Sequence, residues 1–162
     1  MVQFTVRDYR RADFDTLWRI DQSCFPPGIA YSRYELLVYM RRPGAFSLVA
    51  EPQEQRAEGP KLLGFVVAES NRRGIGHIIT IDVHADARRH RVGSTLLGAA
   101  EKKLRAGKCH VVRLETAVDN TSALTFYKRH GYDVIKVIPN YYSNGVDALL
   151  LEKNLLSAGS AS

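Results

Sequence analysis

The chain has 162 residues, 45% of them hydrophobic and 25% charged, and this length and composition fit one globular domain. They exclude a low-complexity chain, and no apolar run approaches the roughly 20 residues that a membrane-spanning helix requires. The 23 Lys and Arg residues against 17 Asp and Glu residues give a net charge of +6, which fits an anionic ligand, nucleic acid or ribosomal surroundings without choosing among them.

The cysteines and histidines show no spacing typical of a disulfide framework or a metal site. Cys24 and Cys109 stand alone in apolar contexts, which favours a reducing compartment. The five histidines are scattered, so we expect no metal. The N-terminus lacks the apolar segment of a signal peptide. We therefore expect a soluble, cytoplasmic protein without a membrane partner.

The first 40 residues predict a strand and two helices. Residues 3–9 alternate apolar and polar side chains, as a half-buried strand does. Residues 12–24 place apolar side chains at helical spacing, and Ser32 is positioned to cap a second helix over residues 32–40. Two prolines interrupt the helical pattern in residues 25–31. This loop is either one wall of a pocket or a plain connector whose aromatic residues enter the core.

Three strand-like segments follow. Residues 45–51 and 62–70 are rich in apolar side chains, and the polar segment between them, residues 52–60, predicts an exposed hairpin loop. A turn sequence at residues 71–74 leads into an apolar, β-branched run over residues 77–83. Together these segments predict a meander of strands.

The second half of the chain alternates helices and strands. Apolar side chains at helical spacing predict a helix over residues 93–106, and residues 109–117 are again strand-like. Asp119 and Asn120 can cap a further helix that ends at Gly131. Two strands, and a low-complexity tail that we expect to be flexible, complete the pattern: residues 132–138, 146–151 and 157–162.

The element order is β-α-α-β-β-β-α-β-α-β-β, which predicts an α/β (α+β) fold and a single domain over residues 1–156. Strand 77–83, helix 93–106 and strand 109–117 form a parallel βαβ unit, whose crossover is almost always right-handed. Ligands of open α/β sheets bind at the carboxyl ends of parallel strands. We therefore expect a ligand near the loop that follows residue 83.

A basic loop lies at that position. Arg88, Arg89, His90 and Arg91 come just before Gly93, where the predicted helix begins. A helix N-terminus offers an anion unpaired N–H groups and the positive end of the helix dipole. Basic runs are also common on solvated surfaces. The loop is therefore either a phosphate-binding site or a solvated surface.

The element order and three motifs resemble the GNAT superfamily of acyl-CoA-dependent N-acetyltransferases over residues 4–155. The motifs are a strand that ends in Ile-Asp-Val, an Arg-x-x-x-x-Gly loop that opens a helix, and Asn-x-x-Ala-x-x-Phe-Tyr before a Gly-Tyr pair. Within the superfamily the chain is most similar to the ribosomal-protein N-terminal (alanine) acetyltransferases. That similarity rests on four segments: Phe25-Pro26, Leu114-Glu115-Thr116, residues 120–127 and residues 140–151. The resemblance implies a GNAT-type mixed, mostly antiparallel seven-stranded sheet, with helices on both faces and a central parallel βαβ unit.

One position departs from the family pattern. The family loop usually has glycine where this chain has Arg91, whereas Gly93 matches a second family glycine. Glycine allows backbone N–H groups to approach a pyrophosphate closely. An arginine fits at position 91 if its φ is helical, and the loop must differ if its φ is positive.

The resemblance implies acetyl-CoA as the co-substrate. Its pantetheine amides would pair with the backbone of Ile81 and Val83, and its pyrophosphate would rest on residues 89–94. Asn120 matches a family position that contacts the cofactor, although a simple helix cap is also compatible with this residue. The implied cofactor-binding residues are Ile81, Val83, Arg88, Arg89, His90, Arg91, Val92, Gly93, Ser94 and Asn120.

The resemblance assigns the role of general base to Glu115 and that of general acid to Tyr127. Acetyl transfer from a thioester to an amine needs a base for the amine proton and a proton for the departing thiolate. A tyrosine, with a reference pKa of about 10, is protonated at pH 7 and can donate to a thiolate. Without the resemblance, the residues favour an exposed or ion-paired carboxylate at Glu115, for example one paired with Arg113, and a place in the core for Tyr127.

The chemistry of the acceptor favours a protein N-terminus. An α-amine with a pKa near 7.8 is about 10% neutral at pH 7, whereas a lysine with a pKa near 10.4 is less than about 0.1% neutral. A weak carboxylate base therefore suits the α-amine. In the resembled subgroup two loops flank the peptide groove, and the matching loops here predict Tyr31 and Tyr142 as substrate contacts.

The leading hypothesis is an acetyl-CoA-dependent N-acetyltransferase that acts on the N-terminal α-amine of a protein or peptide, with ribosomal proteins among the candidate acceptors. Lysine side chains or a small amine are alternative acceptors. A non-catalytic CoA-binding or ribosome-binding module is an alternative of another class, and the presence of both Glu115 and Tyr127 argues against it. We expect no specific nucleic-acid partner, because the basic residues gather at a helix N-terminus without a recognisable reader motif.

Overall fold

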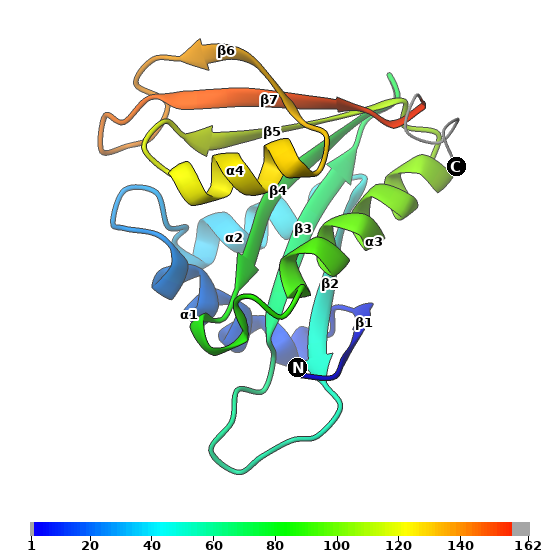
Figure 1. Cartoon of the computed structure of the whole chain (residues 1–162), viewed down its shortest axis with the longest axis vertical. Coiled ribbons are helices and arrows are strands. Elements are labelled where there is room, and N and C mark those ends of the chain that lie inside the picture. Colours follow the sequence, from blue (N-terminus) through cyan, green and yellow to red (C-terminus); the bar gives the residue numbers. More distant parts are fainter. Residues whose placement is uncertain (1, 157–162) are drawn as a thin grey trace.

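A seven-stranded sheet forms the centre of the molecule, and helices cover both of its faces (Figure 1). The computed structural model describes residues 2–156, so the expected flexible tail at residues 157–162 lies outside the described residues. The strands are β1 (Phe4–Asp8), β2 (Ala45–Pro52), β3 (Gly64–Ser70), β4 (Ile75–Val83), β5 (Val111–Ala117), β6 (Asp133–Ile138) and β7 (Ala148–Asn154). The helices are α1 (Phe14–Cys24), α2 (Arg33–Met40), α3 (Val92–Ala106) and α4 (Thr121–Arg129), with one-turn 3-10 helices at Arg11–Asp13 and Ala85–Ala87.

Two helices begin where the sequence supplies a capping side chain. At α2, Ser32 Oγ accepts a hydrogen bond from the Glu35 N–H at 3.1 Å, and the Glu35 carboxylate accepts one from the Ser32 N–H at 3.0 Å. This reciprocal pair is a capping box. At α4, Asn120 Oδ1 accepts a hydrogen bond from the Ala123 N–H at 3.2 Å. The predicted caps at Ser32 and Asn120 are confirmed.

Strand β7 extends beyond its predicted end at residue 151. Its last residues, from Glu152 to Asn154, are polar, so the apolar pattern did not mark them as strand. They continue the antiparallel register with β5, where Asn154 lies opposite Val111. Hydrogen bonding to a neighbouring strand therefore overrides the local sequence preference at this end.

The strands lie in the order β1-β2-β3-β4-β5-β7-β6. Every neighbouring pair is antiparallel except β4 and β5, which are parallel and are connected by α3. This arrangement confirms the predicted α/β fold, its mostly antiparallel seven-stranded sheet and its central parallel βαβ unit.

Strands β4 and β5 are paired at one end only. Their register runs from Ile75 opposite Val111 to His77 opposite Arg113 and stops there. Beyond these residues the two strands share no register, so the sheet has an opening between them. The backbone edges of β4 and β5 that face this opening are available to a ligand.

A β-bulge turns the side chains of β4 at this opening. Val67 pairs with Thr80 and Ala68 with Ile78, so Ile79 has no partner on β3. Ile78 faces the core under α3, whereas Ile79 packs against the core under α1 and α2. Bulges are common next to active sites, where they change the direction of a side chain.

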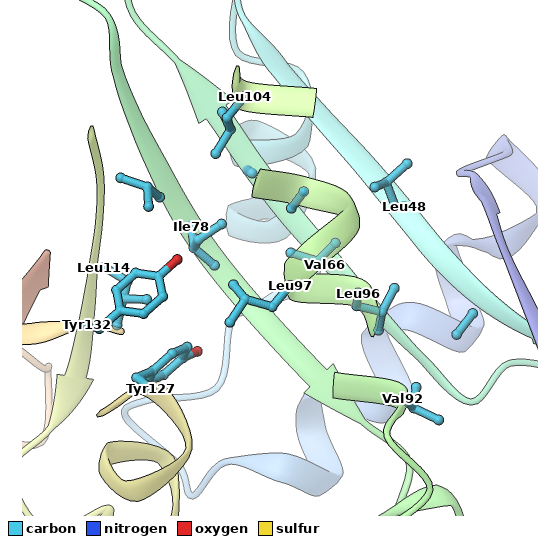
Figure 2. Close-up of a cluster of buried hydrophobic side chains, with 14 of the residues drawn as sticks. Leu48, Val66, Ile78, Val92, Leu96, Leu97, Leu104, Leu114, Tyr127 and Tyr132 are labelled. Carbon is cyan, nitrogen blue, oxygen red and sulfur yellow. The ribbon is translucent and has the colours of Figure 1, made fainter. Parts of the chain in front are cut away.

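Two hydrophobic cores lie on opposite faces of the sheet. The larger core lies under α3 and α4 and includes Leu96, Tyr127 and Tyr132 (Figure 2). The smaller core lies under α1 and α2 and includes the fully buried Leu17 and Leu36. Each face of the sheet therefore brings its own set of side chains to the opening between β4 and β5.

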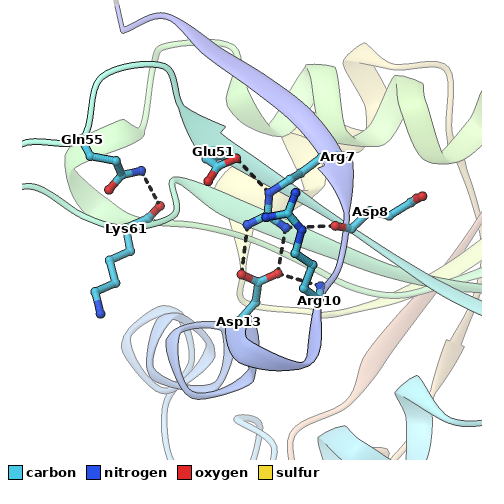
Figure 3. Close-up of polar contacts among 7 residues, drawn as sticks. All are labelled: Arg7, Asp8, Arg10, Asp13, Glu51, Gln55 and Lys61. Atoms are coloured by element: carbon cyan, nitrogen blue, oxygen red, sulfur yellow. Dashed lines mark hydrogen bonds and ion pairs between the residues drawn. The ribbon is translucent and has the colours of Figure 1, made fainter.

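An ion-pair cluster joins the start of the chain to the edge of the sheet (Figure 3). Arg7 on β1 donates to both carboxylate oxygens of Asp13, at 2.9 and 3.0 Å, and to Glu51 Oε2 on β2 at 2.9 Å. Burial raises the pKa of Asp13, but the hydrogen bonds from Arg7 and Arg10 outweigh burial and lower it. The cluster fixes the chain just before α1 begins.

Candidate active site

A cavity of about 640 Å³ occupies the opening between β4 and β5. Phe126 and Tyr127 of α4 line it on one face of the sheet, and Phe25 and Tyr31 of the α1–α2 loop line it on the other. Tyr142 of the β6–β7 loop completes the walls. The cavity therefore passes through the sheet, so two ligands can meet in it from opposite faces, and its size is typical of a ligand-binding pocket.

The α1–α2 loop and the β6–β7 loop meet beside the cavity. Ser143 Oγ donates a hydrogen bond to the Gly28 carbonyl at 2.9 Å. Gly28 has a φ of +90°, and a Cβ at this position would lie 2.7 Å from the Asn144 Cβ, so the contact requires glycine. Of the two interpretations of residues 25–31, the structure shows the pocket wall.

Tyr127 lines the cavity from α4. Its ring packs edge-on against Phe126 and Tyr132, and its hydroxyl forms no hydrogen bond with any other residue in the described range 2–156. Burial raises the pKa of Tyr127, and the nearby Asp82 and Tyr142 raise it further. The hydroxyl therefore remains protonated and free to donate to a ligand.

Glu115 reaches the same cavity from the opposite face of the sheet. It follows Leu114 along β5, and Leu114 lies in the core under α3, so the Glu115 side chain points to the face that α1 and α2 cover. Glu115 Oε1 accepts a hydrogen bond from His77 Nε2 at 2.7 Å and from the Tyr141 hydroxyl at 3.3 Å. The carboxylate is thus held in one orientation at the opening.

His77 is the partner of Glu115 that the sequence analysis missed. Burial lowers the pKa of His77, but the hydrogen bond and charge of Glu115, together with the charge of Glu69, outweigh burial and raise it. The alternative ion pair between Glu115 and Arg113 is wrong, because Arg113 Nε donates to Glu152 Oε2 at 2.7 Å. Only the register of β4 against β5 reveals the pairing with His77, and no local sequence pattern carries that information.

Tyr31 is anchored through its backbone and its hydroxyl. Its N–H donates to Asp21 Oδ2 at 2.8 Å. Its carbonyl accepts hydrogen bonds from Trp18 Nε1 at 3.1 Å and from Gln22 Nε2 at 2.6 Å. Its hydroxyl donates to the carbonyl of Ile79, the residue at the bulge, at 3.4 Å. These contacts fix the ring against the opening.

Tyr142 is the second predicted substrate contact. It packs edge-on against Tyr141, with 4.9 Å between ring centroids, and it lines the cavity. Burial raises the pKa of Tyr142 to about 12, with smaller contributions from Glu115 and Asp119. The structure therefore brings Tyr31 and Tyr142, which are far apart in the sequence, to the walls of one cavity.

Two buried carboxyl groups, Asp21 of α1 and Asp82 of β4, connect the helix to the sheet at the cavity. Thr80 Oγ1 donates to Asp82 Oδ1 at 2.6 Å, whereas Asp21 Oδ1 and Asp82 Oδ2 accept no hydrogen bond from the rest of residues 2–156. The two carboxyl groups interact with each other, and we expect a proton held between them to satisfy both free oxygens. Burial and the neighbouring Asp21 carboxyl raise the pKa of Asp82 well above its ordinary value.

The basic loop before α3 has a left-handed backbone at two arginines. Arg89 has a φ of +68° and Arg91 a φ of +64°. Position 91 therefore keeps a conformation that favours glycine although its side chain is arginine. Of the two possibilities for Arg91, a helical φ or a positive φ, the structure shows the positive φ. A residue other than glycine in this conformation costs about 1–2 kcal/mol.

The start of α3 is suited to an anion. The first intrahelical hydrogen bond runs from the Thr95 N–H to the Arg91 carbonyl at 3.0 Å. The N–H groups of residues 92–94 precede this bond and have no carbonyl partner within the helix. The adjacent loop adds the guanidinium group of Arg88, which lines the cavity.

The structure divides the predicted cofactor-binding residues into three sets. The first set lines the cavity and consists of Ile81, Val83, Arg88, Gly93 and Asn120. The second set lies in the loop outside the cavity lining and consists of Arg89, His90 and Arg91. The side chains of the third set contact the protein instead, because Val92 is buried in the larger core and Ser94 Oγ hydrogen-bonds His130 Nε2 at 3.0 Å.

Residues 2–156 contain neither a metal-ligand cluster nor a membrane-spanning helix. Within residues 2–156, no group of three or more His, Cys, Asp or Glu side chains is arranged to hold a metal ion. No helix in that same part of the chain has both the length and the apolar character needed to cross a membrane. Cys24 and Cys109 are free thiols.

Comparison with known proteins relates this chain to one family. Residues 14–132 match the Acetyltransferase (GNAT) family. An N-alpha-acetyltransferase of Sulfurisphaera tokodaii is 27% identical over 161 residues, which cover 92% of this chain and 92% of that protein.

Solved structures share the same fold. Ard1 from Thermoplasma volcanium superposes with a TM-score of 0.82 at 28% identity, over 94% of this chain and 98% of that chain. The ribosomal-protein-S18-alanine N-acetyltransferase from Escherichia coli superposes with a TM-score of 0.79 at 18% identity, over 94% of each chain, and supports the fold alone. Because the family match spans most of the chain and the relatives cover nearly all of it, this protein belongs to the GNAT family and is an N-acetyltransferase.

Proposed function

We propose that this acetyltransferase transfers the acetyl group of acetyl-CoA to the N-terminal α-amine of a protein or peptide. The observation that carries the proposal is that Glu115 and Tyr127 line one cavity from opposite faces of the sheet. A base and an acid on opposite sides of the reacting carbon are what the attack of an amine on a thioester needs. The similarity to an N-alpha-acetyltransferase supports the choice of acceptor.

In this proposal the donor lies along β4. Beyond His77, β4 has no strand partner on the side of β5, so the backbone of Ile81 and Val83 can pair with the pantetheine amides. The pyrophosphate lies at the N-terminus of α3, where the free N–H groups of residues 92–94 and the cations of the preceding loop stabilise its charge. The residues on this side of the cavity therefore fit acetyl-CoA.

The reaction proceeds by direct attack. The neutral amine nitrogen attacks the thioester carbonyl carbon, a C–N bond forms, and the carbonyl oxygen gains negative charge. Glu115 accepts the proton that the nitrogen loses, either directly or through a water molecule. The C–S bond then breaks, and Tyr127 donates its hydroxyl proton to the departing CoA sulfur. Exchange with solvent returns both side chains to their starting protonation states.

The acceptor approaches from the face that α1 and α2 cover, because Glu115 lies there. Tyr31 and Tyr142 form the walls around its first residue. A carboxylate base suits an α-amine, which is partly neutral at pH 7, better than a lysine side chain. The free thiols of Cys24 and Cys109 fit a reducing compartment such as the cytoplasm, where nascent and ribosomal proteins supply N-termini.

The test measures thiol release from acetyl-CoA with short peptides, including N-terminal sequences of ribosomal proteins, each in a free and an N-terminally blocked form. We expect turnover of the free peptides only. Tyr127→Phe and Glu115→Gln should each lower kcat by about 10²- to 10⁴-fold, the usual contribution of a general acid or base. Tyr34→Phe is the matched control, because this tyrosine is 77% exposed and lies away from the cavity.

If N-terminally blocked peptides that contain lysine are turned over as fast as the free peptides, the acceptor is the lysine side chain and not the α-amine. Binding of acetyl-CoA without turnover of any peptide or small amine would contradict the proposal and favour a CoA-binding module. A Tyr127→Phe variant with wild-type kcat would remove Tyr127 from the role of acid.

A further inference from the structure

A second groove of about 1020 Å³ begins at the catalytic carboxylate and runs away from the first cavity. Glu115 and His77 form its inner end, and the β3–β4 turn forms its outer end. We call it the basic groove. Its charged or titratable lining residues are Arg42, Glu69, Arg72, Arg73, His77, Arg113, Glu115 and Lys136.

The basic groove has an excess of positive charge. Five of its lining residues are cationic, and two of these are in ion pairs. Arg42 Nη1 lies 3.6 Å from Glu69 Oε1, and Arg113 Nε lies 2.7 Å from Glu152 Oε2. The other three cations, Arg72, Arg73 and Lys136, form no ion pair with any of the described residues 2–156 and are exposed. A concave surface with one sign of charge concentrates ligands of the opposite sign.

The turn that presents two of these cations is well ordered by its own hydrogen bonds. Asn71 Oδ1 accepts hydrogen bonds from the N–H groups of Arg73 and Ile75, at 2.9 and 3.1 Å. Gly74 has a φ of +79°, which closes the turn. Arg72 and Arg73 are therefore held at the rim of the basic groove.

The carboxylates of the basic groove gather at its inner end, where Lys136 lies level with Glu115 on the far side of β7, and the two arginines of the turn gather at its outer end. The carboxylates of Glu115 and Glu69 lie at the inner end with His77, and Arg72 and Arg73 lie at the outer end. A continuous polyanion such as RNA would meet repulsion at the inner end. A polypeptide whose amino group lies against Glu115 and whose later side chains are acidic matches both ends.

The spacing fits the first residues of an extended acceptor. Arg73 precedes His77 by four residues, so at most about 14 Å separates their Cα atoms. An extended peptide rises about 3.3 Å per residue. With its N-terminal nitrogen at Glu115, the peptide therefore reaches Arg72 and Arg73 at about its third to sixth residues.

We propose that the basic groove binds acidic side chains at about positions three to six of the acceptor, so that this enzyme prefers N-termini followed by Asp or Glu. The proposal rests on the proposed function, since it takes Glu115 as the place of the reacting amine. It adds a preference that lies outside the catalytic cavity.

The test compares peptides that share their first two residues and carry Glu, Gln or Lys at positions three to six. We expect the Glu peptide to have a KM about three- to tenfold lower than the Gln peptide, with similar kcat, as two or more exposed charge pairs would give. Raising the salt concentration should remove this difference. The double variant R72E/R73E should abolish or reverse the preference for the Glu peptide.

The matched control is R56E/K61E, which changes the net charge equally in the exposed loop between β2 and β3. Binding of each peptide, labelled with a dye at its C-terminus, is measured in parallel by fluorescence anisotropy, so the preference is tested even if no peptide is acetylated. If no peptide is acetylated but the Glu peptide still binds more tightly than the Gln peptide, the proposed function is contradicted and the proposed role of the basic groove is supported. Equal affinity for the three peptides, or equal effects of the two double variants, would overturn the proposal. So would a 20-nucleotide RNA that binds more tightly than the Glu peptide and loses this binding in R72E/R73E.

Discussion

Arg91 combines a charged side chain with a backbone conformation that favours glycine. Its φ of +64° and ψ of +16° place it in the left-handed region at the residue before α3, and its side chain is exposed. Strained residues of this kind cluster at ligand sites, where the surrounding structure holds them in place. Arg91 is the residue directly before the helix N-terminus where the proposed pyrophosphate lies.

We expect Arg91→Gly to raise the free energy of unfolding by up to about 1 kcal/mol, because glycine removes the strain while giving the unfolded chain more freedom. The same variant should raise the KM for acetyl-CoA about three- to tenfold through loss of the cation. Arg91→Ala loses the cation but keeps the strain, so it should raise the KM equally without the gain in stability. Thermal unfolding and donor titrations check both effects, and an unchanged KM in both variants would remove Arg91 from the donor site.

At the scale of elements, the proposed acceptor wall depends on the contact between two loops that lie more than one hundred residues apart in the chain. Gly28 of the α1–α2 loop accepts a hydrogen bond from Ser143 of the β6–β7 loop across a sequence separation of 115 residues. The contact places Tyr31 and Tyr142 on the same cavity. Loop spacing should therefore affect binding of the acceptor more than binding of the donor, for which we propose a place along β4 and α3.

We expect Gly28→Ala to raise the KM for the acceptor peptide and to leave the KM for acetyl-CoA unchanged, because the new Cβ would lie 2.7 Å from the Asn144 Cβ and push the loops apart. Gly131→Ala is the matched control. Gly131 has nearly the same φ, +91°, but its Cβ would meet only the Lys153 side chain, at an ordinary contact distance of 3.5 Å. Both variants should lose about 1 kcal/mol of stability from the positive φ. A higher acceptor KM in Gly131→Ala as well would show that strain, not loop contact, is the cause.

At the scale of the whole molecule, the Asp21–Asp82 pair links folding stability to pH. Folding raises the pKa of both carboxyl groups, chiefly through burial, so the folded protein holds a proton that the unfolded chain releases. The stability that this pair contributes is therefore fully present below the ordinary carboxyl pKa, near 4, and is lost as pH rises through the raised value. Asp13 affects stability in the opposite direction. Folding lowers its pKa, so the stability that it contributes is lost as the pH falls.

We expect Asp82→Asn to make the protein more stable than wild type above neutral pH, by about 1–3 kcal/mol, because the amide donates permanently to Asp21 and needs no proton. Near pH 4 this advantage should vanish, since the wild-type pair is then protonated. Chemical unfolding from pH 4 to 9 measures the difference in the free energy of unfolding between the two proteins. The contributions of other titrating groups such as Asp13 are the same in both proteins and cancel in this difference. A difference that does not change with pH would show that the pair does not share a proton.

Much of this protein follows from its sequence because the relevant signals are local. Hydrophobic periodicity predicts the order of helices and strands, side chains such as Ser32 and Asn120 mark where helices begin, and the motifs around Glu115 and Tyr127 indicate acetyl transfer. Each of these signals depends on residues within a few positions of one another. They therefore predict the fold and the family.

The tertiary structure alone decides which distant groups meet. The pairing of His77 with Glu115, the interaction of Asp21 with Asp82, and the basic groove all depend on where β4 and β5 separate and on which face each residue points to. The left-handed φ of Arg91 likewise depends on how the loop is held between β4 and α3. Strand register and packing are set by the free energy of the whole fold, so no short stretch of sequence contains them.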